Sequence, residues 1–148
     1  MEPISRLVMV TPFNSDIVSL SEDEQLVLLR GCVLCQITRE VENGSTRSKN
    51  DWKSCKEELG CPIDIFTIDK IDAATAEAIE RQAPAVCART TDGRVIRLMA
   101  EDELARCRGS VRDFRGRLLY RLAAVGLTLG PSAGGAGGAN SRPPRPAQ

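Results

Sequence analysis

Histidine is absent from the 148 residues of this sequence. Its absence excludes catalytic triads, imidazole metal sites and imidazole proton shuttles, all of which need a group that titrates near neutral pH. Chemistry in this chain therefore depends on cysteine, carboxylate, lysine or arginine side chains. Aromatic residues are also scarce, at 3% of the chain. Their scarcity argues against nucleic-acid binding, because stacking on bases needs aromatic rings.

Long hydrophobic runs are also lacking. The longest candidate covers residues 118–130 and contains Arg121, whereas a membrane helix needs about 20 apolar residues. Residues 1–10 have mixed charges and no long apolar stretch, so no secretory signal is expected there. The chain is 42% hydrophobic and 27% charged, which is typical of a globular domain. We expect a soluble, cytoplasmic protein that does not enter a membrane.

The formal net charge is zero, but the two parts of the chain differ in sign. Residues 1–80 carry 8 basic and 15 acidic side chains, whereas residues 81–148 carry 12 basic and 5 acidic ones. The basic excess is concentrated in one segment, as Arg106, Arg108, Arg112, Arg115, Arg117 and Arg121. This cluster could bind an acidic protein partner. The alternative, which the scarcity of aromatics favours, is a solvated helix face that balances the acidic half.

Three patterns predict structure in the first third of the chain. The short apolar run of residues 6–11 predicts a strand. Ser21 and Glu24 form a capping box, which predicts a helix over residues 22–29. The apolar residues 26–29 could instead be a buried strand, since periodicity cannot distinguish the two over so short a run. A further apolar stripe with helical spacing predicts a helix over residues 32–42.

The middle of the chain alternates between helix and strand signals. We expect a loop over residues 45–50, then a helix over residues 51–59 that ends at Gly60. Within this helix, Trp52 is expected to be a packing anchor. Residues 63–71 alternate apolar and polar side chains, the strongest strand signal in the chain. A short helix is expected over residues 73–82.

A hairpin, a long helix and a tail follow. Asp92 and Gly93 lie between two strand candidates, residues 85–90 and 94–98, as in a tight hairpin. From Glu101 an apolar stripe with helical spacing predicts a helix that packs on the core, with a break near residues 109–110. Its members are Leu104, Cys107, Val111, Phe114, Leu118, Leu122 and Val125. Residues 131–148 are rich in Gly, Pro and Ala and predict a disordered tail after a domain of residues 1–130.

Cys32 and Cys35 form a C-x-x-C motif, the clearest chemical signal in the sequence. At a helix N-terminus the pKa of Cys32 would fall, and its thiolate could attack a disulfide. Cys35, one turn later, could then resolve the mixed disulfide. Alternatively, both are simply small, buried packing residues.

Metal binding is a further alternative for the cysteines. Cys32, Cys35, Cys55 and Cys61 could supply four thiolates to zinc or to an iron–sulfur cluster. The spacing of the second pair is loose, and the glycine-rich knuckle of zinc ribbons is missing. Cys87 could face the motif, whereas Cys107 lies on the apolar stripe and is expected in the core.

The order strand, helix, strand, helix, strand, strand, helix resembles the thioredoxin fold, and in size it is closest to glutaredoxin-like domains. The resemblance covers roughly residues 6–127. The C-x-x-C motif stands where the family has its redox motif, residues 63–69 where it has its central strand, and Pro84 where it has a cis-proline before a strand that faces the cysteines. The residues between and beside the two cysteines differ from the usual forms.

This resemblance implies an α/β fold with a mixed sheet flanked by helices. It also implies a thiol–disulfide oxidoreductase without a cofactor, whose site contains Cys32, Cys35 and Pro84 and whose partners are protein or glutathione thiols. The motif would lie inside a helix if the first strand is residues 6–11, and in its expected place if that strand is residues 26–30. A non-catalytic domain that binds a partner through the arginine-rich last helix is the remaining alternative.

Overall fold

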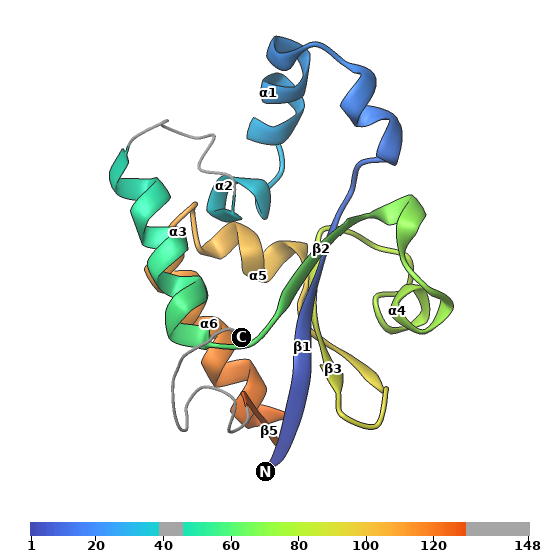
Figure 1. Cartoon of the computed structure of the whole chain (residues 1–148), viewed down its shortest axis with the longest axis vertical. Coiled ribbons are helices and arrows are strands. Elements are labelled where there is room, and N and C mark those ends of the chain that lie inside the picture. Colours follow the sequence, from blue (N-terminus) through green and yellow to red (C-terminus); the bar gives the residue numbers. More distant parts are fainter. Residues whose placement is uncertain (39–45, 130–148) are drawn as a thin grey trace.

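The structure is a computed structural model that describes residues 1–38 and 46–129, with the backbone alone for residues 46–50. Five strands form one mixed sheet with helices on both of its faces (Figure 1). The expected α/β class is confirmed. The expected tail, residues 131–148, lies outside the described residues. Within the part of the chain that the structure describes, no helix is both long and apolar enough to cross a membrane.

The strand order is β2-β1-β3-β4, with β5 paired to the start of β1. The strands are β1 (Glu2–Thr11), β2 (Ile63–Thr67), β3 (Ala85–Thr90), β4 (Val95–Met99) and β5 (Leu127–Thr128). Strand β1 is parallel to β2 and antiparallel to β3, and β3 and β4 form the expected hairpin around Asp92 and Gly93.

The expectation of a central strand over residues 63–71 is wrong in two respects. The strand ends at Thr67, where the 3-10 helix η2 (Ile68–Lys70) begins, and β2 is at the edge of the sheet. Its alternating pattern fits an edge strand, because Ile65 remains 44% exposed. The central position belongs to β1, whose apolar run 7–10 is buried on both faces of the sheet.

Each face of the sheet covers a separate apolar core. Leu7, Met9, Val86 and Ala88 face the larger core, which also contains residues of α5 and α6. Val8, Val10, Ala85 and Cys87 face a smaller core that includes Ile79, on the side where Figure 1 places α4. The expectation that Cys87 faces the C-x-x-C motif is therefore wrong. Successive strand residues point to opposite faces, and the motif belongs to the larger core.

The N-terminal capping box forms as expected. Ser21 Oγ accepts a hydrogen bond from the Glu24 amide at 3.2 Å, and Glu24 Oε1 accepts one from the Ser21 amide at 3.0 Å. Helix α1 (Glu22–Arg30) follows, so the alternative of a strand over residues 26–29 is wrong. A short 3-10 helix, η1 (Ser15–Ser19), connects β1 to this helix.

Two other helices differ from their expected bounds. Helix α2 (Cys35–Thr38) begins three residues after the expected start at Cys32, and residues 39–42 lie outside the described part. Helix α3 (Thr46–Leu59) begins before residue 51, so residues 46–50 of the loop expected over residues 45–50 are helical. It ends before Gly60, whose φ of 67° is accessible to glycine at little cost.

The remaining elements follow the sequence closely. Helix α4 (Ala73–Ala78) is shorter than expected and is capped by Asp72. The Ala83–Pro84 peptide bond is cis and precedes β3. Helices α5 (Glu101–Arg106) and α6 (Val111–Ala124) are separated by the expected break, where Gly109 has a φ of 75°.

The apolar stripe of α5 and α6 is buried as expected, except for Val125, which is 40% exposed. Phe114 is fully buried, and its ring meets that of Trp52 edge-on at a centroid distance of 6.1 Å. Trp52 is 5% exposed, so its role as a packing anchor is confirmed. This contact joins α3 to α6 on the face of the sheet that carries the cysteine motif.

Candidate active site

Cys32 and Cys35 lie in the turn between α1 and α2. Helix α1 is followed by Gly31, and the Cys32 amide still donates to the carbonyl of Leu29 at 3.1 Å. Cys35 then begins α2, and its amide donates to the sulfur of Cys32 at 3.4 Å. Both expected placements of the motif are thus corrected. Cys32 lies outside a helix and Cys35 is the first residue of α2, and the motif does not follow a strand directly, because η1 and α1 intervene between β1 and the motif.

The hydrogen bonds around Cys32 favour its thiolate. They lower the pKa of Cys32 from 9.0 to about 7. The main cause is a hydrogen bond from the Cys35 thiol, and the amides of Cys35 and Leu34 add to it. Burial and the negative charge of Glu101 act in the opposite direction. Donors that point at a sulfur stabilise its charged form, so the site favours a nucleophilic thiolate near neutral pH.

The turn that carries the two cysteines is fixed by contacts on both sides. The side-chain amide of Gln36 donates to the carbonyl of Arg30 at 2.7 Å and so ties the end of α1 to α2. A Cβ placed on Gly109 would lie 3.8 Å from the Cβ of Gln36, so Gln36 also lies close to the break between α5 and α6. Cys32 and Cys35 are only 3% and 1% exposed. These contacts hold the two cysteines in position, and their low exposure leaves little of either residue open to solvent or reagents.

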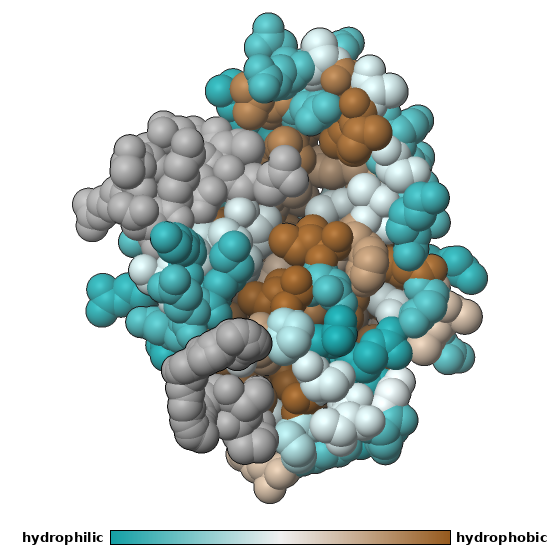
Figure 2. Space-filling model, viewed as in Figure 1, coloured by the Kyte–Doolittle hydropathy of each residue, from teal (hydrophilic) through white to brown (hydrophobic). Residues whose placement is uncertain are grey.

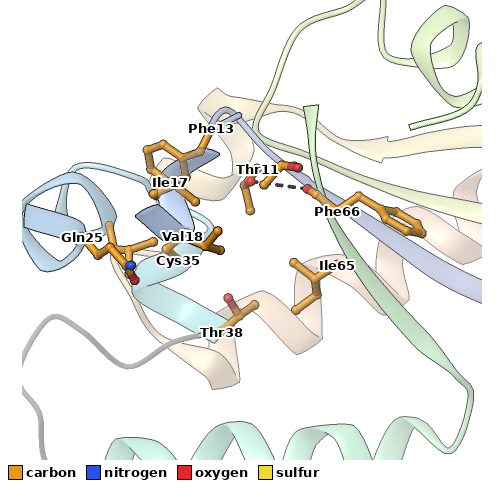
Figure 3. A pocket seen from close by; sticks show the side chains of 11 residues that line it. Thr11, Phe13, Ile17, Val18, Gln25, Cys35, Thr38, Ile65 and Phe66 are labelled. Carbon is orange, nitrogen blue, oxygen red and sulfur yellow. Dashed lines mark hydrogen bonds between the residues drawn. The ribbon is translucent and has the colours of Figure 1, made fainter. Parts of the chain in front are cut away.

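A groove of about 190 Å³ lies beside the pair. Figure 3 shows it between η1, α1, α2 and the edge strand β2, with the side chain of Cys35 in its wall. The Ile65 side chain points toward the groove, whereas that of Phe66 points away on the other side of β2 (Figure 3). The lining residues are Thr11, Phe13, Ile17, Val18, Gln25, Leu29, Cys35, Thr38, Ile65, Phe66 and Thr67. All of them are uncharged.

The η1 wall of the groove is held by Asp69. The amide of Ser15 donates to Asp69 Oδ1 at 2.9 Å, and its hydroxyl donates to Oδ2 at 2.6 Å. These bonds, with one from the Thr67 hydroxyl, lower the pKa of Asp69 to about 2. The Ile68 amide also donates to the Phe13 carbonyl at 3.0 Å. The segment after β1 is thus joined to the segment after β2.

Pro84 lies near the same end of the sheet. Val10 pairs with Ala85 in the antiparallel register of β1 and β3. The preceding residue, Pro84, is therefore opposite Thr11, which lines the groove. Pro84 is buried and is not itself a lining residue. Pro84 is thus opposite one residue of the groove, and Cys35 lines the same groove.

The other four cysteines lie in environments that disfavour a thiolate. Burial raises the pKa of Cys61 and that of Cys87 to about 12, and it also raises those of Cys55 and Cys107. Cys107 is fully buried, as expected for a core residue.

The metal alternative needed four thiolates gathered in one place. Among the described side chains, no group of three or more cysteines and carboxylates is placed to hold a metal ion. Cys32, Cys35, Cys55 and Cys61 therefore do not fit zinc or an iron–sulfur cluster in this arrangement, and no step is derived through such a group.

The arginine cluster divides into exposed and internally paired side chains. Arg106, Arg108, Arg112 and Arg117 are exposed. Arg115 is half-exposed and is paired with Glu58 at 3.1 Å. Arg121 donates to the carbonyl of Leu98 at 2.9 Å and lies 3.5 Å from Glu103. Fewer arginine side chains are therefore available to bind an acidic partner than the sequence suggests.

Sequence reasoning missed the groove and the Ser15–Asp69 contact. The groove residues come from five elements, and no spacing in the sequence relates them. Comparisons with protein-family models, with curated proteins and with solved structures give no match to this chain. The function of the site is therefore inferred from its geometry.

Proposed function

We propose that this protein is a thiol–disulfide oxidoreductase in which Cys32 is the nucleophile and Cys35 the resolving thiol. The observation that carries the proposal is the contact between the two cysteines at the start of α2, where the Cys35 amide points at the Cys32 sulfur from 3.4 Å. Hydrogen-bond donors around one thiol, and a second thiol beside it, are what a dithiol exchange site needs.

The reaction has two steps. The Cys32 thiolate attacks one sulfur of the substrate disulfide, so that a mixed disulfide forms and the other substrate sulfur leaves as a thiolate, which takes up a proton. The Cys35 thiol then loses its proton and attacks the Cys32 sulfur, which releases the second substrate thiol. The substrate disulfide gains two electrons, and the two cysteines lose them as their own disulfide forms.

The arrangement of elements supports a thioredoxin-like domain for this chemistry. The core strands and helices follow one another in the order that resembles the thioredoxin fold. In the one sheet, β1 and β2 are a parallel pair, and β3 and β4 form an antiparallel hairpin. Pro84 precedes β3 opposite Thr11, at the groove. The departure is the η1–α1 segment, which separates β1 from the cysteine motif.

Single cysteine variants test the proposal. Cys32→Ser should abolish the reduction of hydroxyethyl disulfide. Cys35→Ser should stop after one step and accumulate a mixed disulfide on Cys32, which mass spectrometry detects as an added mass on the peptide of residues 31–39. Cys55→Ser is the matched control, because Cys55 is equally buried but lies outside the motif. The proposal fails if Cys32→Ser retains activity, or if the wild-type chain reduces no disulfide.

A second candidate is a thioredoxin-like domain that binds an acidic protein without catalysis. The low exposure of both thiols, at 3% and 1%, favours it. Under this hypothesis Arg108→Glu with Arg112→Glu should weaken binding to polyglutamate and leave the melting temperature unchanged, because neither side chain makes an ion pair among the described residues. Equal binding by the wild-type chain and the double variant would contradict it.

A further inference from the structure

The groove beside the cysteine pair has an aliphatic mouth. Val18 on η1 is 79% exposed, and Ile65 on β2 is 44% exposed. Both line the groove, and Cys35 lines its inner part. Figure 2 shows hydrophobic residues gathered near the middle of this face, in the region where Figure 1 places β2. A side chain that enters the groove passes these two residues and reaches Cys35.

The volume of the groove limits what it can hold. Sites for drug-sized ligands measure roughly 300–1,000 Å³, whereas this groove measures about 190 Å³. It can therefore take one or two side chains of a larger molecule, not a whole substrate. Strand β2 is the last strand of the sheet on this side. The edge of a sheet provides backbone groups along which an extended polypeptide can lie.

The electrostatics of the site disfavour an anionic substrate. Among the side chains that the structure describes, no Lys or Arg lines the groove, so a carboxylate that entered would lose water without gaining a cation from them. The carboxylate of Glu101 also acts on Cys32 through its negative charge. Glutathione disulfide carries several carboxylates and a net negative charge. A polypeptide disulfide flanked by aliphatic side chains brings no carboxylate into the groove. It therefore avoids both the loss of hydration and the repulsion by the negative charge of Glu101.

On the basis of the proposed function, we infer that the groove takes an aliphatic side chain of a polypeptide, adjacent to a disulfide, between Val18 and Ile65. The dithiol then acts on polypeptide disulfides with aliphatic neighbours in preference to anionic small disulfides. The exchange is the one written above: Cys32 forms the mixed disulfide with one peptide sulfur, and Cys35 displaces it. The peptide disulfide is reduced to two thiols, and the cysteine pair is oxidised.

The test compares substrates of different flanking chemistry on the full-length, pre-reduced chain. The substrates are disulfide dimers of a capped leucine–cysteine–leucine peptide, disulfide dimers of a capped serine–cysteine–serine peptide, glutathione disulfide and hydroxyethyl disulfide. The released thiol is measured by chromatography after an acid quench, within a single turnover. Val18→Ser is the test variant. Val27→Ser is its control, because Val27 is 69% exposed on α1 and does not line the groove.

The wild-type chain should reduce the leucine-flanked disulfide about 16-fold faster than the serine-flanked one, since the two methyl groups of one buried leucine contribute about fourfold each. Glutathione disulfide should be slower still. Val18→Ser should reduce the preference for leucine over serine by about fourfold. Val27→Ser should keep the full preference.

Three results would overturn the inference. In the first, glutathione disulfide reacts as fast as the leucine-flanked disulfide. In the second, Val18→Ser and Val27→Ser have the same effect on the preference. In both cases hydroxyethyl disulfide is still reduced, so the oxidoreductase proposal survives. In the third, no disulfide is reduced at all, and both the oxidoreductase proposal and the substrate inference fail.

Discussion

Replacing Cys35 should change the ionisation of Cys32 in a way that depends on the donor left at position 35. The thiol of Cys35 is the largest cause of the lowered pKa of Cys32, and the amides of Cys35 and Leu34 add to it. Cys35→Ala removes the side-chain donor and keeps both amides. We expect the pKa of Cys32 to rise from about 7 toward 9.0 in this variant. Cys35→Ser keeps a hydroxyl donor, so there the pKa should stay near its wild-type value.

The expected rates follow from the fraction of thiolate. At pH 7 a thiol with a pKa of about 7 is about half ionised, whereas one at 9.0 is about 1% ionised, roughly a 50-fold difference. A thiolate of lower pKa is also less nucleophilic, by about eightfold over two pKa units. The net advantage of the wild-type thiol in alkylation at pH 7 is therefore about sixfold, and it reverses above about pH 8.

Alkylation by iodoacetamide as a function of pH measures both quantities. Trypsin cleaves after Arg30 and Arg39, so residues 31–39 form one peptide, and fragment ions assign the label to Cys32 or Cys35. The midpoint of the pH profile is the main readout, because it does not depend on how freely the reagent reaches the sulfur. A wild-type midpoint near 9.0, or the same midpoint in the Ala and Ser variants, would refute the argument.

Three further predictions concern the surrounding fold. Phe114→Ala should lower the free energy of unfolding in urea by about 3–5 kcal/mol, because Phe114 is fully buried against Trp52; an effect below about 1 kcal/mol would contradict its place in the core. Burial raises the pKa of Cys87 from 9.0 to about 12, so the folded thiol keeps its proton after the unfolded one has lost it. The contribution of Cys87 to stability should therefore be constant below pH 9 and be lost as the pH rises toward 12, and Cys87→Ala should fall less steeply over that interval; parallel curves would exclude this role. Asp69→Asn should speed hydrogen exchange at the Ser15 amide, whereas unchanged exchange would mean that η1 is held by other contacts.

Short-range signals in the sequence determined most of the local structure. The capping box of Ser21 and Glu24, the Asp92-Gly93 turn and the apolar stripe around Phe114 each involve residues a few positions apart, and each forms as expected. These features depend on backbone geometry and side-chain spacing within one or two turns. Nearby residues contain that information without help from the rest of the chain.

The tertiary structure alone decided the environment of the cysteines. An apolar run of a few residues cannot say whether a strand is central or at an edge, and the pairing of β1 with both β2 and β3 placed residues 63–67 at the edge. The register of β3 turned Cys87 to the face opposite the motif. The boundary between α1 and α2 brought the Cys35 amide to the Cys32 sulfur.

The groove depends still more on long-range contacts. Val18, Cys35 and Ile65 come from three separate segments, and the Ser15–Asp69 hydrogen bonds span 54 positions. The sequence identified Cys32 and Cys35 as the reactive candidates through their spacing. It could not show that the described residues lining the groove beside Cys35 are uncharged, because the groove forms only when distant segments pack together to bury apolar surface.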